Sequence, residues 1–186
     1  MRADHIDEIA VAGGGDRSSF GFTQVPDGQE EAAGYVQWLL DDAAHGRASP
    51  FVQRRVADGA VVGCTRYLNP LWPLGRADPD EVEIGGTWLS ASAQRTPINS
   101  EAKLLLLTHA FDVWHAQRVA ICTDARNELS RRAIERLGAK FEGVMRRHRR
   151  STCAGEDGAL RDTATYSIVI DEWSMIRARL QAFIEL

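Results

Sequence analysis

Two short polar segments in the middle of the chain contain the residues best suited to chemistry. Residues 92–100 end in Asn99 and Ser100, and residues 124–127 end in Asn127. Each segment follows a strand-like stretch and precedes a helical one, so each would place a helix N-terminus at the end of a strand. The unpaired N–H groups and partial positive charge of such a terminus can hold a phosphate group. The pattern therefore predicts a site for a phosphate-bearing ligand.

The elements that position these segments are read from the apolar pattern. Residues 81–91 and 118–123 read as strands, and the second is almost wholly apolar, as in a strand buried on both faces. Between them we expect a helix capped by Asn99 or Ser100, with Glu101 in its first turn. Its apolar side chains recur at helical spacing, namely Leu104, Leu107, Phe111 and Trp114.

A second helix should begin at residues 124–127 and end at Gly138, since glycine is the usual residue just after a helix. Because the two strands would point the same way, both helix N-termini would lie at one edge of a sheet. The order of elements is then strand, polar turn, helix, strand and helix.

The polar turn reads Gln94-Arg95-Thr96-Pro97-Ile98-Asn99, and the second helix begins with Asn127 and carries Ser130 three residues later. In this arrangement the stretch resembles the GNAT superfamily of acyl-CoA-dependent N-acetyltransferases, and within it the RimJ/RimL-like branch. In that superfamily the turn commonly reads Q/R-x-x-G-x-G/A and cradles the pyrophosphate of coenzyme A. The similarity covers roughly residues 51–173.

The resemblance implies an α/β fold, namely one GNAT-like domain over residues 1–186 with a mixed, mostly antiparallel sheet flanked by helices. It also implies acetyl-CoA as cosubstrate, without a metal, and transfer to a primary amine without a covalent enzyme intermediate. The backbone of Leu89, Ser90 and Ala91 would polarise the thioester carbonyl. The other residues expected at the coenzyme are Gln94, Arg95, Thr96, Ile98, Asn99, Ser100, Asn127 and Ser130.

Two positions depart from the superfamily pattern. Pro97 stands where a glycine is usual, and proline has no N–H to offer a phosphate. Ile134 stands where a tyrosine is usual, seven residues after Asn127. A catalytically lost coenzyme-binding or protein-interaction module of the same fold is therefore the alternative. Capping a helix is the simpler role for Asn127 and Ser130.

Glu83 matches the position of a catalytic strand glutamate in some superfamily members, and Glu142 is the alternative base. At pH 7 an α-amine with pKa ~7.8 costs about 1 kcal/mol to deprotonate, whereas lysine at ~10.4 costs about 4–5 kcal/mol. A strong base is therefore less pressing for an N-terminal acceptor. Ser130 would donate to the coenzyme sulfur, and Asn127 would bind the pantetheine arm. The acceptor stays open among a protein N-terminus, a polyamine and an aminonucleoside, including an amine-bearing antibiotic.

Composition limits the other classes of function. The chain has 186 residues, a net charge of −4 and a pI near 5.7, which gives no electrostatic case for nucleic acid. No apolar run approaches the ~20 residues that span a bilayer. The three cysteines are far apart and suggest neither disulfides nor a metal site. We expect a cytoplasmic enzyme acting on a small-molecule or peptide amine.

The remaining segments supply the rest of the fold. We expect helices over residues 4–12 and 29–44, a hairpin of 51–56 with 61–68, and strands over 141–148 and 161–170. The helix over 29–44 would bury Ala33, Val36, Leu40 and Ala43. The last helix, 173–186, would turn Ile176, Leu180 and Phe183 inward. Phe20, Phe22 and Trp38 would either line the acceptor site or belong to the core.

A group of arginines surrounds the connection between the last two strands, and it allows two interpretations. The side chains would either receive an acidic acceptor or a phosphate, or form a solvated face. The group comprises Arg146, Arg147, Arg149, Arg150 and Arg161.

The beginning of the chain predicts a difference from relatives, which usually open with an extended strand. Here a helix is expected from residue 4, and four extended residues reach only ~14 Å. The sheet should therefore lack its first strand and expose an edge that invites pairing. A homodimer, or a start site placed too late, would each explain this.

Overall fold

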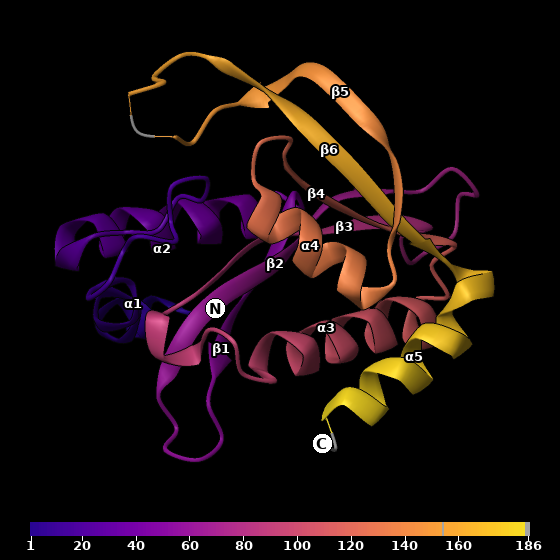
Figure 1. Ribbon diagram of the computed structural model, residues 1–186, viewed down its shortest axis with the longest axis horizontal. Helices are drawn as coiled ribbons and strands as arrows, with labels where there is room; N and C mark the ends of the chain where they lie inside the picture. Colours follow the sequence, from indigo (N-terminus) through magenta and orange to yellow (C-terminus); the bar gives the residue numbers. More distant parts are fainter. Residues whose placement is uncertain (154, 185–186) are drawn as a thin grey trace.

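A six-stranded mixed sheet forms the centre of the computed structural model, which describes residues 1–153 and 155–184 (Figure 1). Its order is β1-β2-β3-β4-β6-β5, and every neighbouring pair is antiparallel except β3 with β4. This confirms the predicted mixed, mostly antiparallel α/β fold. The strands are β1 (Ala48–Arg54), β2 (Val61–Leu71), β3 (Glu81–Leu89), β4 (Arg118–Asp124), β5 (Lys140–Arg150) and β6 (Leu160–Val169).

The parallel pair of β3 and β4 is short. Only residues 81–83 pair with residues 118–120. Beyond them, the facing edges of residues 84–89 and 121–124 have no strand partner in the described part of the chain. The two strands therefore stop pairing towards their C-terminal ends, and we call the region between these two unpaired strand edges the opening.

Helices cover the two faces of the sheet unequally. One face packs against α3 (Ile98–Thr108), α4 (Glu128–Leu137) and α5 (Ile170–Ile184), which share one apolar core with β2, β3, β4 and β6. On the other face, α1 (Ile6–Gly13) and α2 (Gly28–Ala44) enclose a second core over β2 and the end of β3. Neither core includes a side chain from this second face of β4 or β6. We call the whole second face, from β2 to β6, the open face. None of the helices within the described residues is long and apolar enough to span a membrane.

The two strand-to-helix turns form largely as their residue types predict. The β4 strand is mostly buried, and Asn127 caps α4 by accepting a hydrogen bond from the Ser130 amide at 3.0 Å. Gly138 ends α4 with φ 98°, a left-handed conformation that glycine adopts without steric cost. These boundaries confirm the predicted strand and helix.

The start and the end of the preceding helix differ from the prediction. Pro97, rather than Asn99 or Ser100, occupies the N-cap position of α3, and residues 99 and 100 lie inside the helix. Proline fits there because its φ of −64° is helical and the missing N–H has no partner in a first turn. At the other end, residues His109–Val113 continue α3 as a π-helix. The preceding strand ends at Leu89, and Ala91–Ala93 form a 3₁₀ turn.

Two buried helix faces were predicted correctly only in part, since Val36 of α2 is buried as predicted. In α2 the buried side chains are Ala32, Tyr35, Val36 and Leu39. Ala33, Leu40 and Ala43 of the predicted stripe are not among them, and only Leu40 packs partly buried against the core. In α5, Ile176 and Leu180 are buried as predicted, but Phe183 is 54% exposed.

No strand precedes β1 in the described part of the chain, as predicted. A 3₁₀ turn (Ala3–His5) and α1 occupy the first residues, and β1 forms the edge of the sheet. The ammonium group of Met1 donates a hydrogen bond to the Pro50 carbonyl at 2.8 Å. One backbone acceptor of the edge strand is thereby satisfied.

A lysine lies buried between α3 and the sheet. Lys103 is 4% exposed and makes no ion pair in the described part of the chain. Its Nζ donates to the hydroxyls of Thr87 at 2.7 Å and Thr65 at 3.3 Å. Burial lowers the pKa of Lys103 to about 7 because the charged form loses its hydration.

We predict that Lys103→Met stabilises the protein in a pH-dependent way. The unfolded chain binds a proton at Lys103 up to about pH 10 and the folded chain only up to about 7, so the wild type gains stability as pH rises between these values. Denaturation of both proteins should show the advantage of the variant growing by about 1 kcal/mol per pH unit from pH 10 down to 7. Parallel stability curves over this range would contradict the prediction.

Candidate active site

The opening between β3 and β4 begins at Glu83, the last β3 residue that pairs with β4. Glu83 is 5% exposed and lies on the open face, because its neighbours Val82 and Ile84 belong to the core beneath. Both oxygens of its carboxylate accept from the Arg149 guanidinium, at 2.8 and 2.6 Å, and one also accepts from the Asn69 side chain at 3.0 Å. This bidentate ion pair compensates a charge that would be costly to bury alone.

Arg149 reaches Glu83 because the β5–β6 hairpin bends across the open face. Between Met145 and Arg149 the register of β5 shifts by two residues relative to β6, and such bulges bend a strand. Figure 1 shows this hairpin arching over the side of the sheet on which α2 lies. Local sequence gave no signal for the pair, since its members are 66 residues apart. Arg149, one of the arginines predicted to surround the connection between the last two strands, therefore pairs with a buried carboxylate.

Two consecutive glycines form the floor of the site next to Glu83. The pairing of β2 with β3 is irregular at Arg66, which faces both Gly85 and Gly86, and Gly86 has φ 56°. A Cβ on Gly86 would lie 2.6 Å from Cζ of Arg66. The guanidinium therefore lies against the Gly86 backbone, whose positive φ favours glycine.

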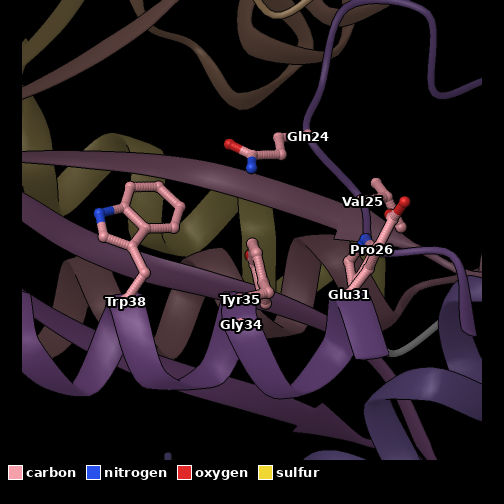
Figure 2. Close-up of a pocket in the computed structure, with 7 residues that line it drawn as sticks. All are labelled: Gln24, Val25, Pro26, Glu31, Gly34, Tyr35 and Trp38. Atoms are coloured by element: carbon pink, nitrogen blue, oxygen red, sulfur yellow. The ribbon is translucent and has the colours of Figure 1, made fainter. Parts of the chain in front are cut away.

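A pocket of about 420 Å³ opens between α2 and the connection that precedes it (Figure 2). Tyr35 and Trp38 project into it from α2, and the Arg66 guanidinium lies 4.8 Å from the centre of the Trp38 ring. Burial raises the pKa of Tyr35 to about 12, and its hydroxyl accepts a hydrogen bond from the Trp88 indole at 3.1 Å. The lining residues are Gln24, Val25, Pro26, Glu31, Gly34, Tyr35 and Trp38.

Contacts between two distant connections cover the open face. The Thr152 hydroxyl, after β5, donates to the Phe22 carbonyl, between α1 and α2, at 2.9 Å. Arg126 lies 5.5 Å from the Phe22 ring centre and pairs with Asp124. Of the three candidate aromatics, Phe22 belongs to this cover and Trp38 lines the pocket. Phe20 packs edge-on against Trp88 in the core.

Side-chain hydrogen bonds fix the shape of the polar turn that was predicted to hold pyrophosphate. The Gln94 side chain donates to the Ser19 hydroxyl at 2.7 Å and to the Leu89 carbonyl at 3.0 Å. The Thr96 hydroxyl donates to the Ala93 carbonyl at 2.7 Å. These two side chains shape the turn, and their donors are not free for a ligand.

The backbone of the same turn offers unpaired donors. The amides of Arg95, Thr96, Asn99 and Ser100 make no hydrogen bond with the described part of the chain. Arg95 adopts φ 59°, an uncommon conformation outside glycine that turns this backbone sharply before Pro97. Ile98 lies at the first helical position, and its amide has only a long contact of 3.4 Å with Thr96. The turn thus presents several N–H groups despite the proline.

The second turn keeps polar groups free as well. Asn127 uses its side-chain oxygen for the helix cap, so its NH₂ group is unengaged among the described residues. The Ser130 hydroxyl likewise has no partner there, and the residue is half-buried. Asn127 therefore caps α4 through its side-chain oxygen, and its NH₂ group remains available as a hydrogen-bond donor.

The alternative base, Glu142, also lies in an ion pair. It contacts Arg118 and accepts from the Ser167 hydroxyl at 2.7 Å. Glu142 is on β5, at the level where Ser167 faces Ala120. Both candidate carboxylates therefore have an arginine partner.

Part of the backbone of Leu89, Ser90 and Ala91, which was expected to polarise the thioester carbonyl, is already hydrogen-bonded within the sheet. The Ser90 amide donates to the Val62 carbonyl at 2.8 Å and is thus occupied within the sheet. Leu89 is six residues along β3 from Glu83, about 20 Å at strand spacing.

The sheet is divided by a short parallel pair, two helix N-termini lie beyond this pair, and a buried carboxylate lies at its base. The chain belongs to the GNAT acetyltransferase domain family, whose model matches residues 1–140. Among the described residues, no group of three or more His, Cys, Asp or Glu side chains could hold a metal ion.

Several solved structures share this fold. A protein from T. thermophilus, described in general terms as an acetyltransferase, is 32% identical, with TM-score 0.81 over 99% of this chain and 90% of its own. A GCN5-related N-acetyltransferase from Brucella melitensis is 29% identical, with TM-score 0.80 over 97% and 78%. RimJ from Mycobacterium smegmatis, in complex with CoA-disulfide, is 23% identical, with TM-score 0.76 over 98% and 86%. Among curated proteins, no sequence matches the chain.

We predict that Glu83 and Arg149 are energetically coupled. Glu83→Gln and Arg149→Gln should each destabilise the protein by about 1–3 kcal/mol, because each leaves a partly buried charge without its partner. The double variant should lose about 1–2 kcal/mol less than the sum of the two. Urea denaturation of the four proteins measures this coupling, with the exposed Arg150→Gln as control. A coupling near zero would mean that the pair contributes nothing.

Proposed function

We propose that the protein transfers an acetyl group from acetyl-CoA directly to a primary amine. The observation that best supports this is the opening between β3 and β4, with unpaired backbone on both sides and a helix N-terminus beyond each strand. Family membership independently favours acetyl transfer.

The chain offers matching groups for each part of the coenzyme. The pantetheine arm carries amide groups, which can pair with the free strand edges of residues 84–89 and 121–124 as an added strand would. The amides of Arg95, Thr96, Asn99 and Ser100 would hold the pyrophosphate at the start of α3. Asn127 and Ser130 would contact the arm from the start of α4.

Acetyl-CoA, when bound, supplies the acetyl group as an activated thioester. The chain's own residues must then orient the amine, receive its proton and stabilise the departing sulfur. Glu83 would receive the proton through water, with Arg149 and Asn69 holding its carboxylate in place. The Ser130 hydroxyl would donate to the sulfur. Since the Glu83 oxygens already accept three hydrogen bonds, an α-amine, which is easily deprotonated, suits this site better than a lysine.

We predict that acetyl-CoA binds and is consumed in the presence of a suitable amine. Calorimetry should detect binding at micromolar to millimolar coenzyme, because several backbone donors remain for the pyrophosphate despite Pro97. A screen of peptide N-termini, polyamines and aminonucleosides, followed by thiol release, should identify the acceptor class. Absence of binding at millimolar coenzyme would refute the proposal. Binding without turnover on any amine would favour the catalytically lost module.

We also predict that Ser130→Ala lowers kcat more than it weakens coenzyme binding. A contact to a developing thiolate strengthens in the transition state, so its loss appears in turnover. Removing one such donor should reduce kcat by about 10-fold to 100-fold. Steady-state kinetics and calorimetry on the same preparation separate the two effects. A variant with wild-type kcat would remove Ser130 from the chemistry.

A further inference from the structure

Two arginines on the open face have no carboxylate partner among the described residues. Arg66 on β2 and Arg161 on β6 are both half-buried, and the Nε atom of each is buried without a hydrogen-bond partner there. Other buried or half-buried arginines, such as Arg149 and Arg118, form ion pairs. Leaving two guanidinium groups partly desolvated and without an ion-pair partner costs free energy, unless a ligand pairs with them.

Arg66 lies beside the floor of the site. Leu68 pairs with Glu83, and Arg66 is two residues further along the same face of β2. Its guanidinium is held between the Trp38 ring and the bare backbone of Gly86. The side chain is therefore fixed on the pocket side of the opening, next to Glu83.

Arg161 lies on the opposite side of the opening. It pairs with Arg149 across the hairpin and shares a face of β6 with Thr163 and Thr165, which pair with Asp124 and Cys122 of β4. Burial lowers the pKa of Arg161, and Asp124, Arg149, Glu83 and Cys122 are all close enough to influence it. The Thr163 hydroxyl, fully buried on the same face, also has no hydrogen-bond partner in the described part of the chain.

The charges around the opening do not balance. Glu83 is matched by Arg149, and Arg126 is shared between Asp124 and Glu156. When Arg66 and Arg161 are added, four arginines face three carboxylates, which leaves one net positive charge in a protein whose net charge is −4. A simple ammonium acceptor would be repelled there, whereas an acceptor that also carries an anionic group would complete both guanidiniums.

We propose that the acceptor is a primary amine bearing a carboxylate or phosphate group, which Arg161 and Arg66 recognise from the two sides of the opening. This inference rests on the proposed acetyl transfer and specifies its substrate class. It also divides the arginine group of the β5–β6 connection. Arg161 faces the site, whereas Arg146, Arg147 and Arg150 are exposed and form a solvated surface.

Matched acceptor pairs test the proposal. β-Alanine is compared with β-alaninamide, the peptide amide Ala-Asp with Ala-Asn, and phosphoethanolamine with ethanolamine. In at least one pair the anionic member should have a kcat/KM higher by about tenfold or more, as expected for a charge-assisted hydrogen bond. The pair that responds most distinguishes a free carboxylate, a peptide side chain and a phosphate as the source.

Substitutions then locate the recognition. Arg161→Gln and Arg66→Gln should each lower the preference for the anionic member about tenfold, mainly through KM. Arg161→Lys keeps the charge but not the planar fork, and should retain part of the preference. Arg146→Gln, on the same hairpin but exposed, should leave the preference unchanged. Thermal unfolding of every variant confirms that it is folded.

Each outcome is decisive. Turnover without preference for the anionic member of any pair, or a preference unaffected by both Gln variants, overturns the substrate class and leaves acetyl transfer standing. If no amine is acetylated, calorimetry with the same compounds still applies. Tighter binding of an anionic compound that weakens in Arg161→Gln supports the site, and equal or absent binding within every pair refutes it.

Discussion

The three-residue ladder between β3 and β4 is the constraint on which the rest of this structure depends. It divides the sheet into two halves, because β3 pairs fully with β2 and β4 pairs fully with β6, while the halves join only at residues 81–83 and 118–120. A longer ladder would close the opening and satisfy the backbone edges that now face it. A shorter one would leave α3 and its shared core with α4 and α5 as the main link between the halves.

The Glu83 ion pair complements this ladder on the open face. Asn69 comes from the same half as Glu83, whereas Arg149 comes from the far edge of the other half. The carboxylate is thereby fixed from both sides of the opening, at the point where the strands begin to separate. A buried charge thus gains its compensation and the two halves gain a second connection. The glycines at 85 and 86 leave room for it, since a Cβ on Gly85 would lie 3.1 Å from Oε1 of Glu83.

Features set by short-range patterns could be predicted from the sequence. The apolar run of β4, the Asn127 cap and the Gly138 terminus are decided within a few residues, whereas the mixed sheet was implied by the family resemblance. What failed depends on tertiary contacts. The buried side of α2 includes Tyr35, whose hydroxyl accepts a hydrogen bond from Trp88, 53 residues away in the sequence. The partner of Glu83 is set by how β5 bends, and hydrophobic periodicity carries no information about that.

In the candidate site, residue types indicated the two turns. They did not indicate which groups of each turn fix its shape and which stay free for a ligand. Gln94 and Thr96 were expected to face a ligand, yet their side chains hold the turn in shape, and the adjacent backbone remains free. Asn127 does both. Arg66 gave no signal in the sequence because its position depends on the β2–β3 irregularity, a feature that only the paired strands reveal.

The contact of Thr152 with Phe22 has a consequence for the time course of turnover. It joins two surface connections through one neutral hydrogen bond, supported by the Arg126–Phe22 contact, and each is worth only about 1 kcal/mol. Thermal motion can part such connections within microseconds to milliseconds without disturbing either core. Under the proposed function, small acceptors and products could then exchange quickly beneath the hairpin, and the chemical step rather than release would set the rate. A peptide acceptor, being larger, would need both contacts broken for as long as it stays bound.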